Sequence, residues 1–494
     1  MRMALKSTLP RAIYVVVSNF MKTLILQIVF LLSIFASGQI SGVPTDTAKA
    51  IDKLMQTLHE RGQYNGSIII AINGKIIYRN GLGESNFDTH KKFTPETISC
   101  LASVSKQFTA MTIMILGEQN KLRYDDLLSK YIPELTKYAD GVTIRNLLTH
   151  TSGIPDVGDL GIDHPGLTNN EVLRALIKQE SLVFKPGTKY QYSNTGYVLL
   201  AIIVERVTKK SFNDYLAEKI LLPLKMSKTF LYDGSQSRSG DVAGGYNQFG
   251  LKDDFNSLET GDGGMFSTVD DLLKWDRALY SERLVKQSTL DTAFTPAKVI
   301  EGTTTYGFGW NITGTGENRM VWHTGNTAGF RAFIERVLKD RIAIIMLTNK
   351  GNSKRMEISN AILNILKGLP YQLPRRPISE RMYGMINEHG VDFAIKTYDS
   401  LRAAHDTTYD FSESELNTLG YQLLSEDKKN DGVQIFKLNT LNYPTSSNAF
   451  DSLGDAYSAI RDKDSAIASY QKAVELDKNN VQSRDKLNRL KKLK

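Results

Sequence analysis

The sequence lacks the residues that would mark several common kinds of protein. It has one cysteine, Cys100, so no disulfide can form within the chain, and a disulfide-dense secreted scaffold is excluded. We expect Cys100 to be a small buried packing residue. The seven histidines are scattered with no metal-ligand spacing, so the sequence predicts neither a metal site nor any other cofactor.

An excess of one charge is also missing from the body of the chain. The formal net charge is +8, but Arg2, Lys6, Arg11 and Lys22 lie in the first 38 residues, which contain no acid. Residues 481–494 add six basic residues against one acid. The remaining residues, 39–480, have a net charge near zero. Because binding to nucleic acid requires a basic stripe across the fold, we predict no nucleic-acid partner.

Long hydrophobic runs are absent except near the N-terminus. Residues 24–36 form an apolar run that follows Met21 and Lys22 and is followed by small residues. This pattern predicts a cleavable signal peptide over residues 1–38, with Met21 as an alternative start. We therefore expect an exported protein, periplasmic or secreted, without a stable membrane span; an uncleaved segment would instead anchor it to the membrane.

Two hairpin patterns predict an antiparallel sheet built from distant parts of the chain. Asn73-Gly74 separates β-rich residues 66–72 and 75–79, which is a strong hairpin signal. A second hairpin is expected over residues 330–348. The sequence between them is mostly helical or loop-like. The fold class predicted for residues 47–368 is therefore α+β, with an antiparallel sheet flanked by helices and a helical insertion.

A proline-rich segment, residues 369–378, predicts a linker to an all-α helical-repeat domain over residues 379–494. Leu419-Gly420 recurs after 34 residues as Leu453-Gly454, and neighbouring positions carry small and aromatic residues. This region resembles tetratricopeptide repeats, which bind protein partners. The alternatives are an unrelated pair of helical hairpins and a stabilising appendage without a partner.

The chemistry of the chain is first indicated by Ser103 and Lys106, at the start of an apolar helical run. Residues three apart share a helix face, so the two side chains can meet. A serine becomes a nucleophile when a nearby base takes its proton. The same spacing occurs at residues 425–428 and 483–486, where we assign no chemistry. The pair alone therefore does not specify an enzyme.

Four later segments strengthen this interpretation. They are residues 147–155, 184–194, 261–268 and 322–326, which include Tyr192-Ser193-Asn194 and His323-Thr324-Gly325-Asn326. The order of these segments resembles the serine β-lactamase-like superfamily, which includes class C β-lactamases, D-alanyl-D-alanine carboxypeptidases, esterases and D-amino-acid peptidases. The resemblance covers roughly residues 47–368.

The resemblance implies a role for each matching residue. Ser103, Lys106 and Tyr192 would be catalytic, because Tyr192 can relay protons beside a cation. Asn194 would hold Lys106 and the substrate amide. The strand segment His323, Thr324, Gly325 and Asn326 would bind substrate, with the backbone N–H groups of Ser103 and Asn326 forming an oxyanion hole.

His323 departs from the superfamily pattern, which usually has lysine at this position. Because histidine is mostly neutral at pH 7, it attracts a substrate carboxylate less strongly. We therefore expect an acyl-serine hydrolase acting on an amide, a D-amino-acid peptide or an ester, cell-wall peptides included, rather than an efficient β-lactamase. The alternative is a weak or inert penicillin-binding-type protein that acts as a binding module through its helical repeats.

Overall fold

The computed structural model describes residues 46–232, 234, 241–255 and 257–492. The predicted signal peptide, residues 1–38, lies outside this range. Among the described residues, no helix is both long and apolar enough to cross a membrane.

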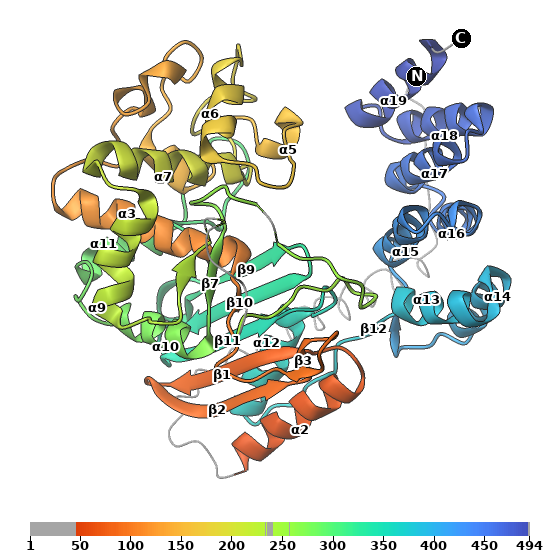
Figure 1. The fold of residues 1–494 in the computed structure, drawn as a ribbon, viewed down its shortest axis with the longest axis horizontal. Helices are drawn as coiled ribbons and strands as arrows, with labels where there is room; N and C mark the ends of the chain where they lie inside the picture. The colour runs from red at the N-terminus through yellow and green to blue at the C-terminus, as the bar shows by residue number, and fades with distance from the viewer. Residues whose placement is uncertain (1–45, 233, 235–240, 256, 493–494) are drawn as a thin grey trace, which may run out of the picture.

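A six-stranded antiparallel sheet forms the centre of the first part of the chain, in the order β2-β1-β11-β10-β9-β8 (Figure 1). The strands are β1 (Gly66–Ile72), β2 (Lys75–Leu82), β8 (Asn311–Thr313), β9 (Met320–Thr327), β10 (Phe330–Val337) and β11 (Ile342–Thr348). Strands β1 and β11 pair over their full length, from Gly66 opposite Thr348 to Ile72 opposite Ile342. The two predicted hairpins thus join into one sheet, and the predicted α+β fold class is confirmed.

The β1–β2 turn follows from its two residues. Asn73 and Gly74 have φ values of 51° and 71°. Positive φ at both central positions is the condition for a turn whose twist matches that of the strands, and Asn-Gly meets it with little strain.

Alternation along the strands separates two hydrophobic cores. Ile68, Ile70 and Ile72 of β1 face a layer formed by α2 (Thr47–Glu60) and α12 (Arg355–Leu366). Ile69 and Ala71 face the opposite, larger core. Both faces of the sheet are therefore covered, which explains why β1 and β11 are apolar at almost every position.

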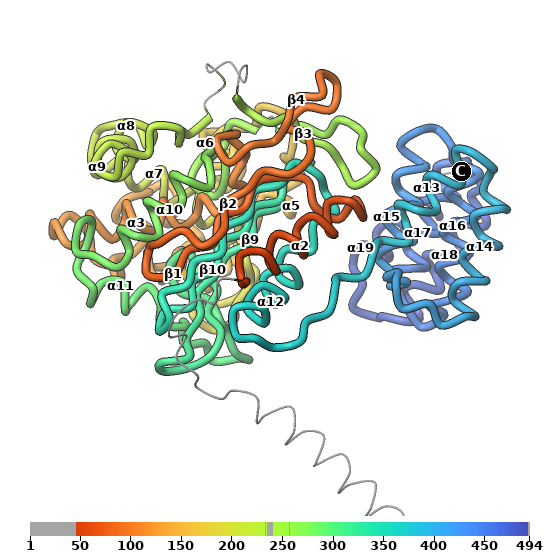
Figure 2. The backbone as a smooth tube through the Cα atoms, turned by 90° about the horizontal axis from the view of Figure 1, so that it is seen from below, coloured from red at the N-terminus to blue at the C-terminus, as the bar shows by residue number. Residues whose placement is uncertain are grey.

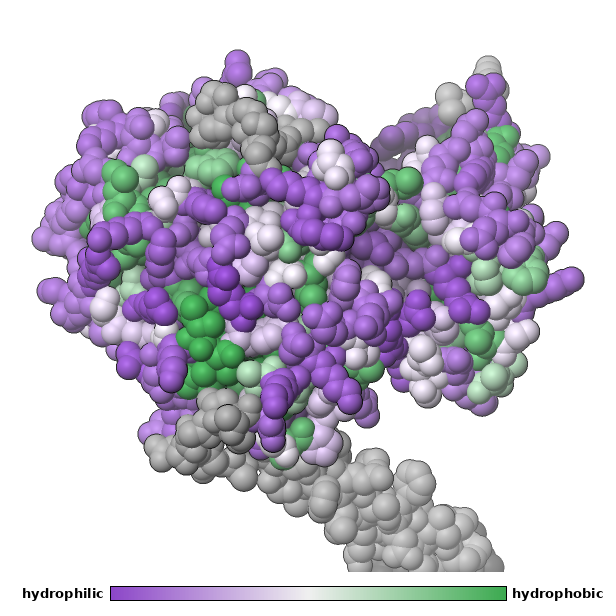
Figure 3. All heavy atoms as spheres, turned by 60° about the horizontal axis from the view of Figure 1, so that its bottom comes forward, coloured by the Kyte–Doolittle hydropathy of each residue, from purple (hydrophilic) through white to green (hydrophobic). Residues whose placement is uncertain are grey.

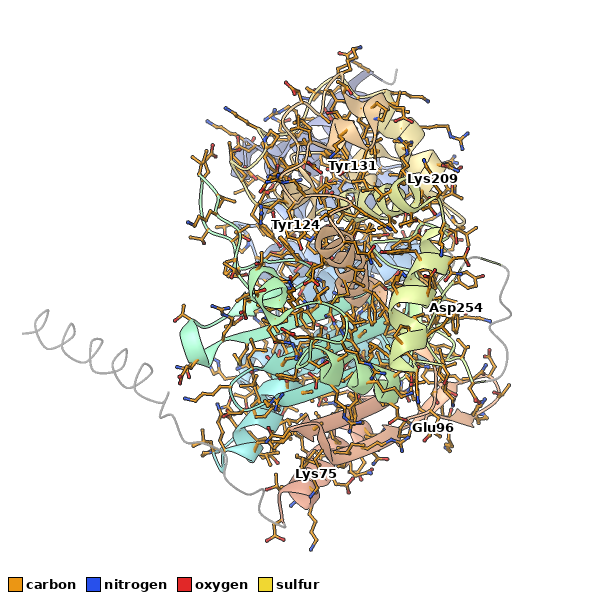
Figure 4. The ribbon with its side chains drawn as sticks, turned by 90° about the vertical axis from the view of Figure 1, so that its left-hand side faces the viewer. Lys75, Glu96, Tyr124, Tyr131, Lys209 and Asp254 are labelled. Atoms are coloured by element: carbon orange, nitrogen blue, oxygen red, sulfur yellow. The ribbon has the colours of Figure 1, made fainter. Side chains whose placement is uncertain are left out.

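The larger core lies under the helical insertion. Its helices are α3 (Lys106–Glu118), α4 (Ile144–Leu148), α5 (Val157–Leu160), α6 (Asn169–Ile177), α7 (Asn194–Thr208), α8 (Phe212–Leu216), α9 (Leu222–Leu224), α10 (Val269–Ala278) and α11 (Gln287–Ala293). Lys75, after the hairpin turn, lies at the bottom of Figure 4, whereas Tyr124 and Tyr131 lie in the upper, helical part. Two short sheets complete this part: β3 (Glu84–Asn86) with β4 (Lys91–Lys92), and β5 (Ser99–Cys100) with β7 (Met265–Ser267) and β6 (Phe230–Leu231).

The C-terminal part is a stack of antiparallel helix pairs beside the first part (Figure 2). Its elements are β12 (Arg376–Pro377), α13 (Ile378–His389), α14 (Val391–Ala403), β13 (Tyr409–Asp410), α15 (Glu413–Ser425), α16 (Lys429–Asn442), α17 (Ser447–Ala459), α18 (Lys463–Leu476) and α19 (Val481–Lys492). The predicted linker spans most of the segment between α12 and α13. The C-terminal part is helical as expected, while its assignment to the tetratricopeptide family stays a prediction.

Candidate functional site

Ser103 lies in a short 3-10 turn, Ala102–Ser105, which leads directly into α3. The eleven residues from Lys106 to Leu116 are all buried, because α3 is mostly apolar and runs through the larger core. Ala102, just before the serine, has a φ of 45°, an unfavourable value for a residue with a Cβ. The turn holds Ser103 at the buried N-terminal end of α3.

Lys106 connects three parts of the chain. Its Nζ lies 3.2 Å from Ser103 Oγ, 2.7 Å from Asn194 Oδ1 and 2.8 Å from the backbone oxygen of Asp262. The residue is fully buried, at 0% exposure. An ammonium has three N–H donors, and these three oxygens are its acceptors. Lys106 must therefore give up one proton before it can accept another from Ser103.

Asn194 is held by the start of α7. Ser193 is the N-cap residue, and Asp156 Oδ1 accepts hydrogen bonds from Ser193 Oγ (3.1 Å) and from Thr195 N–H (3.0 Å). A carboxylate that accepts several hydrogen bonds fixes a loop firmly. The sequence did not identify Asp156, because only the path of its loop brings it to this turn.

Tyr192 lies beside Lys106, but its ring faces the lysine, whereas the sequence predicted a contact through its hydroxyl. Lys106 Nζ is 5.0 Å from the centroid of the Tyr192 ring. This is a cation–π distance. The structure shows no hydrogen bond from the Tyr192 hydroxyl to Ser103 or Lys106. Tyr192 is 36% exposed, so part of its side chain can be reached from solvent.

The sequence predicted that His323 would bind substrate, but the structure buries its side chain. It is 2% exposed. Its Nδ1 lies 2.6 Å from the backbone oxygen of Thr324, which can only accept, so Nδ1 carries the proton. Its Nε2 therefore accepts a hydrogen bond from the Tyr306 hydroxyl, at 2.8 Å. Burial, with help from the charge of Lys106, lowers the pKa of His323 to about 3, so the ring is neutral.

His150 forms a second neutral histidine below the site. The Ser193 N–H donates to its Nδ1 at 3.1 Å, and its ring lies 4.2 Å from that of Tyr192. Burial, together with the charge of Lys106, lowers its pKa well below the usual value. These contacts give His150 a supporting position beside Tyr192 and Ser193.

Gly325 is required for close packing of β9 within the protein. A Cβ at this position would lie 2.1 Å from the backbone oxygen of Leu101 and 3.2 Å from the Ala102 side chain. The glycine thus lets β9 pack directly against the segment that carries Ser103. Arg355 supports the same strand end, because its Nη1 donates to the Gly325 oxygen and its Nη2 to Asn326 Oδ1, at 2.7 and 2.6 Å. Arg355 was not identified from the sequence.

A cavity of about 450 Å³ opens at the serine. Ser103, Asn194 and Asn326 line it, whereas Tyr192, His323, Thr324 and Gly325 lie outside its lining. The structure therefore brings the predicted residues into one region but only three of them to the cavity wall.

In the part of the chain that the structure describes, no group of three or more His, Cys, Asp or Glu residues could hold a metal ion.

Comparison with known proteins agrees with this arrangement. Residues 48–368 match the family model described as Beta-lactamase. Penicillin-binding protein 4* of Bacillus subtilis (strain 168) is 33% identical over 358 residues, which cover 67% of this chain and 79% of that protein. Protein flp of Staphylococcus aureus (strain N315) is 29% identical over 368 residues, covering 71% and 72%.

Solved structures show the same fold. The octameric penicillin-binding protein homologue from Pyrococcus abyssi has a TM-score of 0.61 and 29% identity, covering 70% of this chain and 82% of that one. The D-amino acid amidase from Ochrobactrum anthropi SV3 has a TM-score of 0.57 and 24% identity, covering 66% and 99%, which is a likeness of fold alone. With a family match over well more than half of its length, the chain belongs to the beta-lactamase family of serine hydrolases.

Proposed function

We propose that this protein is an exported hydrolase that cleaves an amide, a D-amino-acid peptide or an ester through an acyl-serine intermediate. Residues 47–368 would form the hydrolase domain, and residues 379–494 a helical-repeat domain joined to it by residues 369–378. The observation that carries the proposal is the position of Lys106 Nζ, 3.2 Å from Ser103 Oγ at the wall of the cavity. A base at that distance can take the serine proton.

The reaction proceeds in two halves. In the first, Lys106 releases one ammonium proton to solvent. Ser103 Oγ then bonds to the substrate carbonyl carbon while the serine proton passes to the Lys106 amine, directly or through Tyr192. The carbonyl oxygen gains a negative charge, which the backbone N–H groups of Ser103 and Asn326 would stabilise. The bond to the leaving amine or alcohol then breaks, and the leaving group takes up the proton.

In the second half, water takes the place of the leaving group. Its oxygen bonds to the acyl carbon as one of its protons passes to Lys106. The bond to Ser103 Oγ breaks, and the serine regains a proton. The acid product leaves the cavity, and the site returns to its starting protonation.

The cavity supports an amide or ester rather than a β-lactam. β-Lactam antibiotics carry a carboxylate, which a cation on the enzyme would bind. His323 stands where such a cation is usual, and it is buried and neutral. The cavity lining contains no lysine or arginine. Small-molecule or peptide substrates, cell-wall peptides included, remain the proposed class.

Covalent labelling tests the nucleophile. We expect a fluorophosphonate to label the full-length protein, and Ser103→Ala to reduce labelling at least about a hundredfold, because no covalent bond to the serine oxygen can form. Ser105→Ala is the matched control, since the Ser105 hydroxyl is 1% exposed and accepts from the Met265 N–H. Equal labelling of Ser103→Ala and wild type would show that another residue is the nucleophile.

A further inference from the structure

Two arginines lie behind the wall of the Ser103 cavity. Arg355, the first residue of α12, is 8% exposed, and Arg331 of β10 is partly buried. Arg355 Nη2 donates to Asn326 Oδ1 at 2.6 Å, and Asn326 lines the cavity. Arg331 Nη1 donates to the oxygen of Ala328, another lining residue, at 2.7 Å. Neither arginine forms an ion pair with a carboxylate among the described residues. A buried charge without such a partner is costly, so the pair calls for an explanation beyond packing.

The positive charge of Arg355 is destabilised by its surroundings. Burial, with repulsion from Arg331, lowers the pKa of Arg355 to about 9, so the guanidinium still carries its charge at neutral pH. Burial lowers the pKa of Arg331 as well, and Asp253 opposes this effect without forming an ion pair. A negative charge close to Arg355 would stabilise the guanidinium. Attack of a serine on a carbonyl creates such a charge on the carbonyl oxygen.

Arg355 holds the peptide unit that would meet this oxygen. Its Nη1 donates to the Gly325 oxygen at 2.7 Å. The Gly325 carbonyl and the Asn326 N–H belong to one trans peptide unit, so the N–H points away from Arg355. A hydrogen bond to the carbonyl polarises the peptide unit and makes its N–H a stronger donor. Nη1 also donates to the Ala332 oxygen at 2.7 Å, which ties β9 to β10 at this point.

The same guanidinium orients the side chain of Asn326. A guanidinium can only donate, so the amide oxygen of Asn326 faces Arg355 and the NH2 group is directed elsewhere. Within the described part of the chain, this NH2 group makes no hydrogen bond. Asn326 lines the cavity together with Ser103. Arg355 therefore fixes both the backbone and the side-chain donors of a residue at the cavity wall.

We propose that Arg355 is a positioning residue of the oxyanion hole. It fixes the Gly325–Asn326 peptide unit, strengthens the Asn326 N–H as a donor, and places a buried positive charge behind the oxygen that becomes negative. Arg355 acts through Asn326 and does not touch the substrate. This inference rests on the proposed hydrolase function and deepens it, because it names the group that tunes the same site.

Hydrolysis of p-nitrophenyl acetate by the full-length protein tests this role. We expect Arg355→Met to lower kcat and kcat/KM together, each at least about tenfold, because an interaction made mainly in the transition state is lost. Arg355→Lys keeps the charge but loses the planar fork, so its kcat should fall about fivefold. Arg283→Met is the matched control and should keep both constants, since Arg283 is exposed and donates to the Pro223 oxygen outside the cavity lining.

Inhibition by phenylboronic acid gives a readout that a loss of stability would not imitate. Its boron bonds to Ser103 Oγ and becomes a tetrahedral anion, which resembles the intermediate of the reaction. The inhibition constant should rise at least about tenfold in Arg355→Met, while the KM for the ester changes less than about threefold. An unchanged inhibition constant, or a rise in KM that alone explains the loss of kcat/KM, overturns the inference.

The conservative variant keeps the test decisive if Arg355→Met does not fold. Thermal unfolding shows whether each variant is folded, and wild-type kcat and inhibition constant in folded Arg355→Lys would overturn the inference. Either result leaves the hydrolase function intact, provided that a fluorophosphonate labels Ser103 of the wild type. If Ser103 is not labelled at all, the proposed function itself fails, and this inference fails with it.

Discussion

At the scale of single residues, His323 shows how a side chain can occupy a motif position and yet face the core. Buried and more exposed positions alternate along β9, and His323 shares its face with Val321 and Gly325, which are both buried. Because the strand period is two, the position of Gly325 against Leu101 already fixes the direction of His323. The side chain therefore supports Tyr306 instead of meeting a substrate.

Burial of neutral His323 predicts a loss of stability in acid. Its folded-state pKa of about 3 lies below the ordinary value of about 6.5, so the unfolded chain binds the proton first. The stabilisation is complete above about pH 6.5 and falls as the pH drops towards 3, with a slope approaching about 1.4 kcal/mol per pH unit. Denaturant unfolding of wild type and His323→Asn between about pH 7 and 4.5 measures this loss of the free energy of unfolding.

We expect His323→Asn to be less stable than wild type at neutral pH but to lose less free energy of unfolding on acidification. His405→Asn, which replaces an exposed histidine at a φ of 51° that asparagine tolerates, is the control. Parallel pH profiles for wild type and His323→Asn would contradict the neutral, buried state of the ring.

The sequence predicted some site residues and missed others for a physical reason. Ser103 and Lys106 are three residues apart, so local helix geometry was enough to bring them together. The supporting residues come from distant loops. Asp156, Glu259 and Arg355 reach the site only through the packing of the insertion on the sheet, and nothing local marks them. Asp262 lies inside the segment 261–268 that the sequence singled out, but its burial does not follow from the sequence of that segment.

At the scale of elements, the hairpins were predictable and the insertion was not. The Asn73-Gly74 turn and the β-favouring patterns on either side of the turns fix β1, β2, β10 and β11 locally. The joining of the two hairpins in one antiparallel sheet was also predicted, whereas the order of the strands in that sheet was not. The paths of residues 156–166 and 241–255 depend on tertiary packing, so no local sequence pattern predicts them.

The helix pairs of the C-terminal part depend on glycines that face aromatic rings. A Cβ at Gly454 would lie 2.5 Å from the ring of Tyr470, and one at Gly420 would lie 2.5 Å from Phe436. Both contacts lie between paired helices, α17 with α18 and α15 with α16. We expect Gly454→Ala to lower the free energy of unfolding by about 1–3 kcal/mol, because the buried Tyr470 ring must shift. Thermal and urea unfolding measure the change.

Gly384→Ala is the matched control for this prediction. Gly384 also lies inside a helix, α13, but nothing lies within 4 Å of a Cβ built there. Alanine should therefore raise stability by about 0.4–1 kcal/mol through its better helix propensity and the smaller entropy of the unfolded chain. If Gly454→Ala raised the free energy of unfolding as Gly384→Ala does, close packing between the paired helices would not explain the glycine at position 454.

At the scale of the whole molecule, the helical part is joined to the hydrolase part by more than the linker. Figure 3 shows a face that is mostly hydrophilic over both parts, with apolar side chains in a few small areas. Between the parts, the Phe249 ring packs at a tilt against the Tyr383 ring, with centroids 4.6 Å apart, and Asn247 Nδ2 donates to Gln422 Oε1 at 2.9 Å. An ion pair between Lys354 and Asp410 adds to this contact, at 2.5 Å.

This contact reaches the cavity through one loop. Phe249 lies only four residues before Asp253, which lines the cavity, and the Asp253 N–H donates to the Gly245 oxygen in the same loop. Docking of α13 on Phe249 therefore holds the start of a segment whose end lines the cavity. The helical part would thus support the site, whether or not it also binds a partner.

Phe249→Ala should loosen the helical part and the cavity together. Loss of the ring pair removes about 0.5–1.5 kcal/mol beyond the lost burial, so the parts should separate more often and linker residues 369–378 should be cleaved about tenfold faster in limited proteolysis. KM should rise while labelling of Ser103 persists, because the nucleophile lies on a different segment. Phe393→Ala, which truncates a 49% exposed ring on α14, is the control and should change neither quantity. Faster cleavage at an unchanged KM would show that the loop holds its shape without the helices.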